Sequence, residues 1–393
     1  MKRWIGVLLL ASPHFAAAQQ DSPFTPNRLD HMLTGSQVRI AASGMYGGSS
    51  VDLLAITSAA QIADDFMPAD LLLIGGLLPG TSKVEFGARG RAALVTIVHA
   101  RDWFISASAE AASYAAANIP EDAANLLRKG NVLENAPIDT RNLFARGLIT
   151  RELGLAIARR HDLDGITFEA GAAVRHLSPV AFASGRIYAL SEGPALVVDN
   201  GQLSAHADVV HSSGQAAGSG YALDLHVAAV TRNLRASLSL TDLGKVRVDA
   251  RTHHRTLDVQ DVSVEELLDA IDRTSATVAD ESRTRTLPPR IEARVSSAFS
   301  RQVSGGLFFR QQAAGDLGVD ESTLGAVVGW LPADVVRLRG GLAWIDQGRW
   351  ALLAGASVDV GRLQLEVSFD ADRPTFIDHA RALALSTGFA VRF

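Results

Sequence analysis

Residues 381–393 read RALALSTGFAVRF and place apolar side chains at alternate positions, ending on an aromatic residue. In a β-strand successive side chains point to opposite faces, so this stretch presents one apolar face. Its apolar members are Leu383, Leu385, Phe389, Val391 and Phe393. Strands of transmembrane β-barrels alternate in this way. We therefore expect the stretch to be the last strand of an outer-membrane barrel, with Phe389, Val391 and Phe393 as its barrel-assembly signal.

Upstream, the same alternation recurs across short turns. Residues 362–370 place apolar side chains on one face and charged or polar side chains on the other, and residues 336–344 and 350–360 follow a similar pattern. Consecutive strands joined by short turns predict an antiparallel meander. Further segments of this kind begin at residue 37. Together they predict an all-β fold, a transmembrane antiparallel β-barrel of about 14 strands.

A soluble periplasmic β-sandwich would show the same alternation, so the pattern alone leaves both folds open. The number of hairpins and the terminal strand favour the barrel. After residue 18 the longest apolar run, residues 71–78, is well short of the roughly 20 residues that a membrane-spanning helix needs. Within hydrocarbon, helices and closed barrels are the structures that pair every backbone polar group. Tryptophans near predicted strand ends fit either an interfacial girdle or a buried core: Trp103, Trp330, Trp344 and Trp350.

The N-terminus has the three parts of a secretory signal. Lys2 and Arg3 precede an apolar run, residues 4–11, and a set of small residues ends at Ala18. We expect residues 1–18 to be a cleaved signal peptide and residues 19–393 to form a single outer-membrane β-barrel domain. Export and a barrel fold together predict the outer membrane of a Gram-negative bacterium, with outer-membrane lipid and the barrel-assembly machinery as partners.

The composition excludes several classes of protein. The chain has no cysteine, which removes disulfides, thiol catalysis and thiolate metal sites. Its formal charge is −5 and becomes −7 once Lys2 and Arg3 are removed, because each carries one positive charge. Nucleic-acid-binding proteins need a basic footprint, so we expect no nucleic-acid partner.

Three segments interrupt the strand pattern. Residues 50–82, after the first strand, have helical spacing broken by proline, which predicts a helical insertion that is either a plug in the lumen or an exposed loop. Residues 120–129 read as a short surface helix with proline in its first turn. Residues 250–289 read as a long loop that contains a helix. The apolar stripe of that helix consists of Val264, Leu267, Leu268 and Ile271.

The sequence carries no motif for catalysis, a metal ion or a cofactor. It has no nucleophile elbow, phosphate-binding loop, calcium loop or pair of histidines at ligand spacing. The adjacent His253 and His254 would point to opposite faces of a regular strand and could not bind one ion together. We therefore expect a protein that is not an enzyme and that has no catalytic, cofactor-binding or metal-binding residues.

The charged face of the C-terminal strands is more informative. If the alternation is read correctly, side chains of both signs point into the lumen: Arg337, Arg339, Arg362, Glu366 and Asp370. Mixed signs on neighbouring strands favour a structural network of ion pairs that fills the barrel. The alternative is a selectivity filter, for which a run of one sign would be the stronger indication.

Several short motifs carry a family resemblance. They are IPEDAANLLRKGN at 119–131, RELGLAIARRHDLDGITFEAGAAVRHL at 151–177, LDL at 223–225 and LTDLG at 240–244. They resemble an uncharacterised family of outer-membrane β-barrels that is similar to conjugal-transfer TraF-type barrels and, more distantly, to FadL-type transporters of hydrophobic compounds. The resemblance covers nearly the whole chain after the signal peptide. It implies a fourteen-stranded barrel whose N-terminal segment can enter the lumen, and it carries over no catalytic residue.

Two functions are consistent with these observations. The first is a FadL-like barrel that passes or binds a small hydrophobic compound through a plugged lumen and a lateral opening. The alternative is a structural or docking barrel of an envelope export or conjugative transfer apparatus, whose loops bind an envelope protein partner and through which nothing is transported.

Overall fold

The wall of the molecule is one sheet that closes on itself. The computed structural model describes residues 36–48, 84–129, 136–138, 140, 142–190, 192–212, 214–345, 349–372 and 382–393. The first and last wall strands, β1 (Gln37–Gly48) and β18 (Ala382–Arg392), pair antiparallel over nearly their whole length. Because β1 also pairs with β2 (Val84–Ala100), the sheet closes at this seam without an exposed edge.

Fourteen of the described strands form this closed antiparallel wall, so the predicted all-β antiparallel barrel of about 14 strands is confirmed. After β1 and β2 the wall continues through β3 (Trp103–Ile119), β5 (Phe144–Leu163), β6 (Ile166–Ala189), β9 (Ala217–Val230), β10 (Leu234–Val262), β12 (Arg290–Ala298), β13 (Val303–Gln312), β14 (Glu321–Ala333), β15 (Val336–Ile345), β16 (Arg349–Val360) and β17 (Leu363–Ala371), and it ends with β18.

The strands on one side of the barrel are short. Strands β12, β13 and β15 to β18 have 9 to 12 residues, the length of a tilted strand that crosses a bilayer. Buried and exposed residues alternate along them. In β17, for example, Leu363, Leu365 and Val367 are exposed on the outer face, whereas Glu366 and Ser368 are buried on the inner face. The wall is therefore apolar outside and polar inside.

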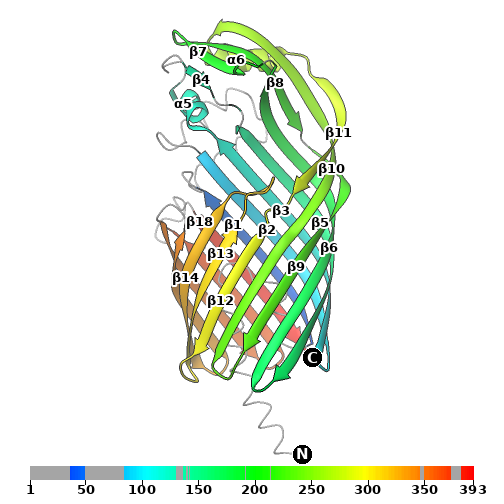
Figure 1. The fold of residues 1–393 in the computed structure, drawn as a ribbon, viewed down its shortest axis with the longest axis vertical. Coiled ribbons are helices and arrows are strands. Elements are labelled where there is room, and N and C mark those ends of the chain that lie inside the picture. Colours follow the sequence, from blue (N-terminus) through cyan, green and yellow to red (C-terminus); the bar gives the residue numbers. More distant parts are fainter. Residues whose placement is uncertain are drawn as a thin grey trace, which may run out of the picture.

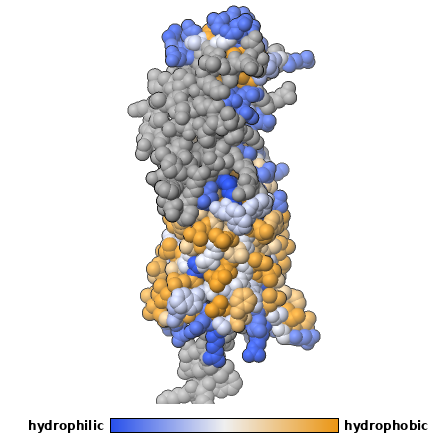
Figure 2. Space-filling view, turned by 90° about the vertical axis from the view of Figure 1, so that its left-hand side faces the viewer, coloured by the Kyte–Doolittle hydropathy of each residue, from blue (hydrophilic) through white to orange (hydrophobic). Residues whose placement is uncertain are grey.

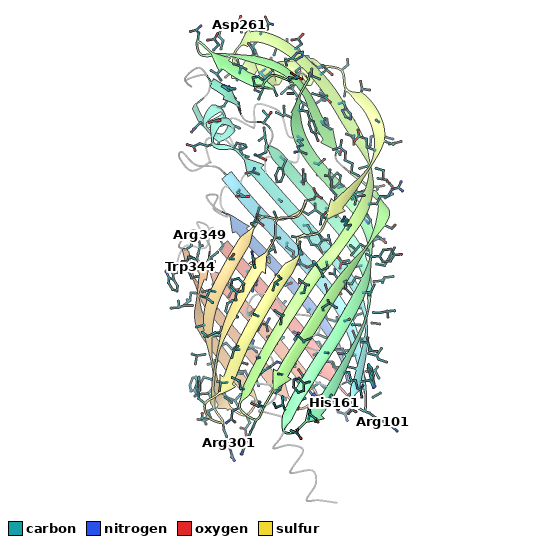
Figure 3. All side chains as sticks on the ribbon, in the orientation of Figure 1. Arg101, His161, Asp261, Arg301, Trp344 and Arg349 are labelled. Atoms are coloured by element: carbon teal, nitrogen blue, oxygen red, sulfur yellow. The ribbon has the colours of Figure 1, made fainter. Side chains whose placement is uncertain are left out.

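The outward apolar side chains form a belt around the lower part of the barrel (Figure 2). The belt lies between the lower turns, where Arg101 and Arg301 are found, and the upper ends of the short strands, marked by Trp344 and Arg349 (Figure 3). Exposed tryptophans lie near both limits. Trp103 and Trp330 are close to the lower turns, and Trp344 and Trp350 are close to the upper strand ends.

On the other side, longer strands rise above the belt. Strands β5, β6 and β10 have 20, 24 and 29 residues. Their upper parts join the short strands β4 (Ala136–Ile138), β7 (Leu196–Asp199), β8 (Gln202–Ser212) and β11 (Thr277–Thr286) in a curved sheet (Figure 1). Helices α5 (Glu121–Lys129) and α6 (Val264–Arg273) pack against this upper sheet. The shared apolar core includes Leu126, Ile138, Leu203, Leu257 and Leu267.

Residues 250–289, expected to be a long loop with a helix, contain the upper end of β10, helix α6 and strand β11. The helix lies where its apolar stripe predicts it, and a capping box at Ser263 and Glu266 starts it. The loop prediction was wrong because most side chains in this part of β10 are polar, and apolar ones such as Leu257 and Val259 are few, although the strand is paired with β8 and β11 above the belt. A largely polar strand lacks the alternation of hydrophobicity from which a strand is predicted.

Other expectations concern the signal peptide, the insertion at residues 50–82 and the last strand. The signal peptide and the helical insertion at residues 50–82 lie outside the described residues. Among the helices that the structure describes, none has the length and apolar character needed to cross a membrane. In β18, Phe389 is exposed on the outer face, and Phe393 is exposed just beyond the strand end. Their role as an assembly signal stays a prediction.

The closing strand provides a test of the outer face. Phe389 pairs in register with Ile40 of β1 and with Leu365 of β17. A cationic side chain on the lipid face of a barrel costs about 2–4 kcal/mol at the bilayer midplane and about 1 kcal/mol or less near an interface. Phe389 lies three residues from the lower end of β18, so Phe389→Lys should measurably reduce the folded fraction. Heat-modifiable mobility in gel electrophoresis measures that fraction. Arg392→Lys keeps the charge at the end of the same strand and should assemble normally; equal assembly of the two variants would contradict an outward, lipid-facing Phe389.

Candidate functional site: the barrel wall beneath an internal cap

Four of the five predicted lumen charges face the interior. Arg337, Arg339, Glu366 and Asp370 are all buried. Glu366 of β17 forms ion pairs with Arg339 of β15 at 3.0 Å and with Arg39 of β1 at 3.1 Å. These pairs are part of a mixed-sign network of the kind that the alternation predicts.

Arg362 does not belong to this network. It lies in the exposed turn before β17, next to Gly361, which has a positive φ of 60°. The prediction for Arg362 was wrong because the alternation was extended to a residue that precedes the first residue of β17, Leu363. A side chain in a turn is not bound by the two-residue period of the strand.

A larger buried cluster has Arg175 of β6 at its centre. The Arg175 guanidinium lies 2.6 Å from Glu152 of β5, 3.0 Å from Asp224 of β9 and 2.5 Å from Asp242 of β10. All four residues are almost completely buried. A buried charge is tolerated when it is paired and hydrogen-bonded, and each partner here meets that condition.

The cluster continues onto β2 and β3. Arg89 lies 2.5 Å from Asp242, Arg91 lies 3.5 Å from Glu110, and the Tyr114 hydroxyl donates to Glu152 at 3.2 Å. A second cluster on the facing wall surrounds Glu292 with Arg290, Arg294 and Arg310. Charged side chains from both walls therefore fill this part of the barrel.

A β-bulge brings Asp242 into the Arg175 cluster. The register between β9 and β10 shifts between Leu240 and Leu243, and Asp242 has a positive φ of 61°. Its backbone N–H donates to the Asp224 carboxylate at 2.8 Å, which fixes the bulge. Position 244 requires glycine, because a Cβ there would lie 2.3 Å from the carbonyl oxygen of Tyr221. Bulges redirect side chains in this way near functional sites.

The four central residues of the Arg175 cluster come from motifs that carry the family resemblance. Glu152 and Arg175 belong to the 151–177 motif, Asp224 to LDL and Asp242 to LTDLG. Sequence reasoning missed them as a set because they are far apart in the chain. In LDL and LTDLG a single carboxylate stands among apolar or small residues, and this is the signal that could have identified Asp224 and Asp242.

Above the cluster, one chain segment crosses the lumen. Residues 313–319, which we call the cap, follow β13 and lead to β14 (Figure 1). Residues 287–289 join β11 to β12 in the wall beside β10, where the Leu287 N–H donates to the Gly244 carbonyl at 3.1 Å. The cap bonds to this connection through the Ala313 N–H and the Pro289 carbonyl at 2.9 Å. Gly315 permits the close approach, since it has a φ of 54° and a Cβ there would lie 2.8 Å from the Leu287 oxygen.

The cap reaches the far wall of the barrel. Leu287 and Leu317 are buried in one apolar cluster with inward residues of β3, β5, β6, β9 and β10, among them Tyr114, Leu148 and Phe182. On β2, a Cβ added to Gly87 would lie 2.9 Å from Val319. Strands β2 and β13 are on opposite sides of the fourteen-strand ring, so the cap spans the lumen.

An ion pair fastens the cap to the far wall. Arg146 of β5 donates to the Asp316 carboxylate and to the Asp316 carbonyl, each at 3.1 Å. Arg285 lies 3.8 Å from the same carboxylate oxygen as Arg146, and the other carboxylate oxygen of Asp316 accepts from the Thr286 N–H at 2.8 Å. We call this group the Asp316 clasp.

The wall beside the cap has a hollow of about 690 Å³ that extends across β18, β1, β2, β3, β5 and β6. Most of its outward-facing residues are small. They are Gly44, Ala88, Gly90, Ser113, Ala115, Gly147, Ala181 and Ala183. Leu383, Leu385 and Ile149 add larger apolar side chains.

The hollow opens on the outside of the wall. One register row of inward residues crosses it, from Met45 through Arg89, Tyr114 and Leu148 to Phe182. Tyr114, Leu148 and Phe182 are 2%, 1% and 3% exposed. They are therefore covered on the lumen side, where they share an apolar cluster with Leu317 of the cap. The accessible surface of the hollow consists of the outward-facing residues that alternate with this row along the strands.

At this level the wall has apolar groups on both of its sides. The inner side carries the cluster of Leu148, Phe182 and Leu317, and the outer side carries the small residues of the hollow. Gly44, Gly90 and Gly147 contribute no side chain, so little more than the backbone separates the two. Such a wall offers an apolar molecule a favourable surface from either side.

The Arg175 cluster makes a prediction about stability. Arg175→Met removes the central cation and leaves Glu152, Asp224 and Asp242 short of a partner, which should lower the free energy of unfolding by about 3–5 kcal/mol. Denaturant unfolding of the barrel in detergent measures this loss. Arg160→Met is the control, because Arg160 is partly exposed where it pairs with Glu169 at 2.8 Å; it should cost about 1 kcal/mol or less. Similar losses in both variants would contradict the central role of Arg175.

A histidine ties together three strands of the upper sheet. In β10, His254 Nδ1 lies 3.0 Å from Asp208 of β8, and His254 Nε2 lies 2.6 Å from Glu281 of β11. The hydrogen bonds to Asp208 and then to Glu281 raise the pKa of His254 above its ordinary value. Both ring nitrogens face carboxylates, so the structure favours the doubly protonated imidazolium.

This arrangement predicts a pH dependence. Because the pKa of His254 is raised in the folded state, its stabilisation is complete below the ordinary value of about 6.5 and is lost as the pH rises through the folded-state value. Amide hydrogen exchange in β11, corrected for the intrinsic effect of pH, should therefore accelerate on the alkaline side. His254→Gln should abolish that change. Acceleration that persists in His254→Gln would contradict the assignment.

Comparisons with known proteins agree with this fold. The structure resembles the Ralstonia pickettii toluene transporter TbuX, with a TM-score of 0.51, 11% identity and coverage of 96% of this chain and 93% of that chain. It also resembles the TodX deltaS2S3 mutant monoaromatic hydrocarbon channel (TM-score 0.54, 11% identity, 98% and 94% coverage) and the CymD monoaromatic hydrocarbon channel (TM-score 0.52, 9% identity, 97% of each chain). At such identities the similarity concerns the fold alone.

The FadL-type part of the expected resemblance is thus confirmed at the level of the fold. The similarity to conjugal-transfer barrels stays a prediction. No curated protein shows a significant match to this chain. A family model matches residues 40–370, most of the chain. The protein therefore belongs to the family described as a family of unknown function (DUF5723).

Proposed function

We propose that the protein is an integral outer-membrane barrel that transfers a small apolar compound between its lumen and the surrounding lipid. The compound would leave or enter through the wall at the hollow, beside the cap. The single observation that carries this proposal is the stretch of wall that has apolar surface on both sides and glycine in three of its strands.

The belt supports the membrane location. Its strands have the length that a bilayer requires, their outer faces are apolar, and tryptophans lie near both limits of the belt. Tryptophan at these two levels is typical of the interfaces between lipid and water. Export through a cleaved signal peptide, the outer membrane of a Gram-negative bacterium and the barrel-assembly machinery as a partner belong to the same proposal.

The filled interior supports an apolar substrate. The Arg175 and Glu292 clusters occupy the barrel with buried, paired charges, and the cap crosses above them. A polar solute moving along the barrel axis would have to separate these pairs, which is costly in a medium of low dielectric constant. An apolar molecule that turns aside at the wall avoids that cost.

The relatives by fold are consistent with this substrate class. TbuX is a toluene transporter, and TodX and CymD are monoaromatic hydrocarbon channels. The alternative function, a structural or docking barrel of an export or conjugation apparatus, predicts that apolar solutes cross membranes with and without the protein at the same rate.

The hollow itself can be filled without changing the fold. Nothing lies within 4 Å of a Cβ built at Gly44, and the same holds at Gly340 on β15, which faces outward away from the hollow. Gly44→Leu should slow protein-dependent uptake of a fluorescent apolar solute into proteoliposomes by roughly tenfold, the effect of about 1.4 kcal/mol on a barrier. Gly340→Leu should leave uptake unchanged. Equal rates in both variants, or no protein-dependent uptake at all, would contradict the proposed function.

A further inference from the structure

We propose that the cap is a gate for this passage and that the Asp316 clasp holds it shut. This inference rests on the proposed function, because it concerns access to the same stretch of wall. It assigns to residues 313–319 a role that sequence reasoning gave to the insertion at residues 50–82.

The position of the cap carries the first step. Leu317 is buried in the same apolar cluster as Tyr114, Leu148 and Phe182, the inward residues of the register row that backs the hollow. In the closed structure these three residues are almost completely covered. A compound in the upper lumen can therefore reach this wall when the cap moves away from it.

The bonding of the cap on its own side of the barrel carries the second step. The Ala313 N–H donates to the Pro289 carbonyl at 2.9 Å, and the Asp316 N–H donates to the Thr286 carbonyl at 3.1 Å, so both bonds join the cap to the connection between β11 and β12. The Ala314 N–H donates to the carboxylate of Asp320, just before β14, at 2.8 Å. These bonds lie beside β13, and they can stay intact if the cap moves away from β2 and β5.

The contacts with the far wall are of a different kind. Val319 touches Gly87 by van der Waals contact, Leu317 adds apolar contact, and Arg146 pairs with Asp316. Asp316 is 32% exposed and Arg146 is 10% exposed, whereas the pairs around Arg175 are almost completely buried. A partly exposed pair is screened by water and salt and stabilises little, so it can open and close reversibly.

The opposite interpretation is that the cap is a fixed brace. Both interpretations predict the same closed structure, and they differ in whether the cap must leave the wall during transfer. The chain has no cysteine, so a pair of introduced thiols can decide between them. A Cβ at Gly87 would lie 3.5 Å from the Val319 backbone nitrogen and 2.9 Å from its side chain, within the reach of a disulfide.

The first experiment locks the cap with Gly87→Cys and Val319→Cys. Under oxidising conditions the double variant should lose most of its uptake of the fluorescent apolar solute, and a reducing agent should restore it. The matched control is Ser368→Cys with Ser386→Cys, a pair within the wall whose hydroxyl oxygens are 2.6 Å apart; its oxidation should leave uptake unchanged. Full uptake by the cross-linked cap variant would overturn the gate, and failure of the pair to cross-link would contradict the closed cap.

The second experiment does not depend on transport. The single variant Val319→Cys reports opening through the rate at which a water-soluble maleimide labels a buried position. Adding Asp316→Asn removes the charge of the clasp and keeps its shape, and it should accelerate labelling about fivefold, which corresponds to about 1 kcal/mol. Adding Asp372→Asn, just after the end of β17, should not accelerate labelling. Equal labelling with and without Asp316→Asn would overturn the clasp.

The two experiments separate the two proposals. If uptake is absent in the wild-type barrel while Asp316→Asn still accelerates labelling, the proposed function fails and the moving cap stands. If uptake occurs and both the lock and the clasp variant are without effect, the proposed function stands and the gate fails.

Discussion

A charged side chain inside the barrel is stable when an opposite charge and hydrogen bonds replace the water it has lost. The wall strands place many charges inside, because one face of every strand must be turned away from the apolar exterior. Arg175 meets the requirement with Glu152, Asp224 and Asp242, and the four residues come from four different wall strands. The network thereby fixes the register and fills the interior, and it leaves the wall as the place where a compound can cross.

The molecule combines two kinds of polar contact. The Arg175 cluster is buried and joins neighbouring strands, so breaking it would leave charges without partners. The Asp316 clasp is partly exposed and joins a connecting segment to the far wall, so water can take its place when it opens. A rigid lower barrel and a separable cap follow from this difference in burial.

Strands β15, β16 and β17 could be predicted from the sequence because they are 9 to 12 residues long, alternate strictly and are joined by short connections. Strand β10 was underestimated because bulges at Asp242 and Asp261, both with positive φ, interrupt its alternation. Residues 313–319 contain two glycines and read as an ordinary turn; only the closure of the ring places them across the lumen. The Arg175 cluster was hidden for the same reason, since its members meet through the closed sheet.

The central claim is that the interior is filled and that transfer takes place through the wall. Conductance across a planar bilayer, with insertion of the barrel verified on the same membranes, tests it most directly. The account predicts no steps of ionic current from the inserted wild-type protein, although apolar solutes cross. Discrete, sustained current steps of the kind a water-filled pore produces would contradict it.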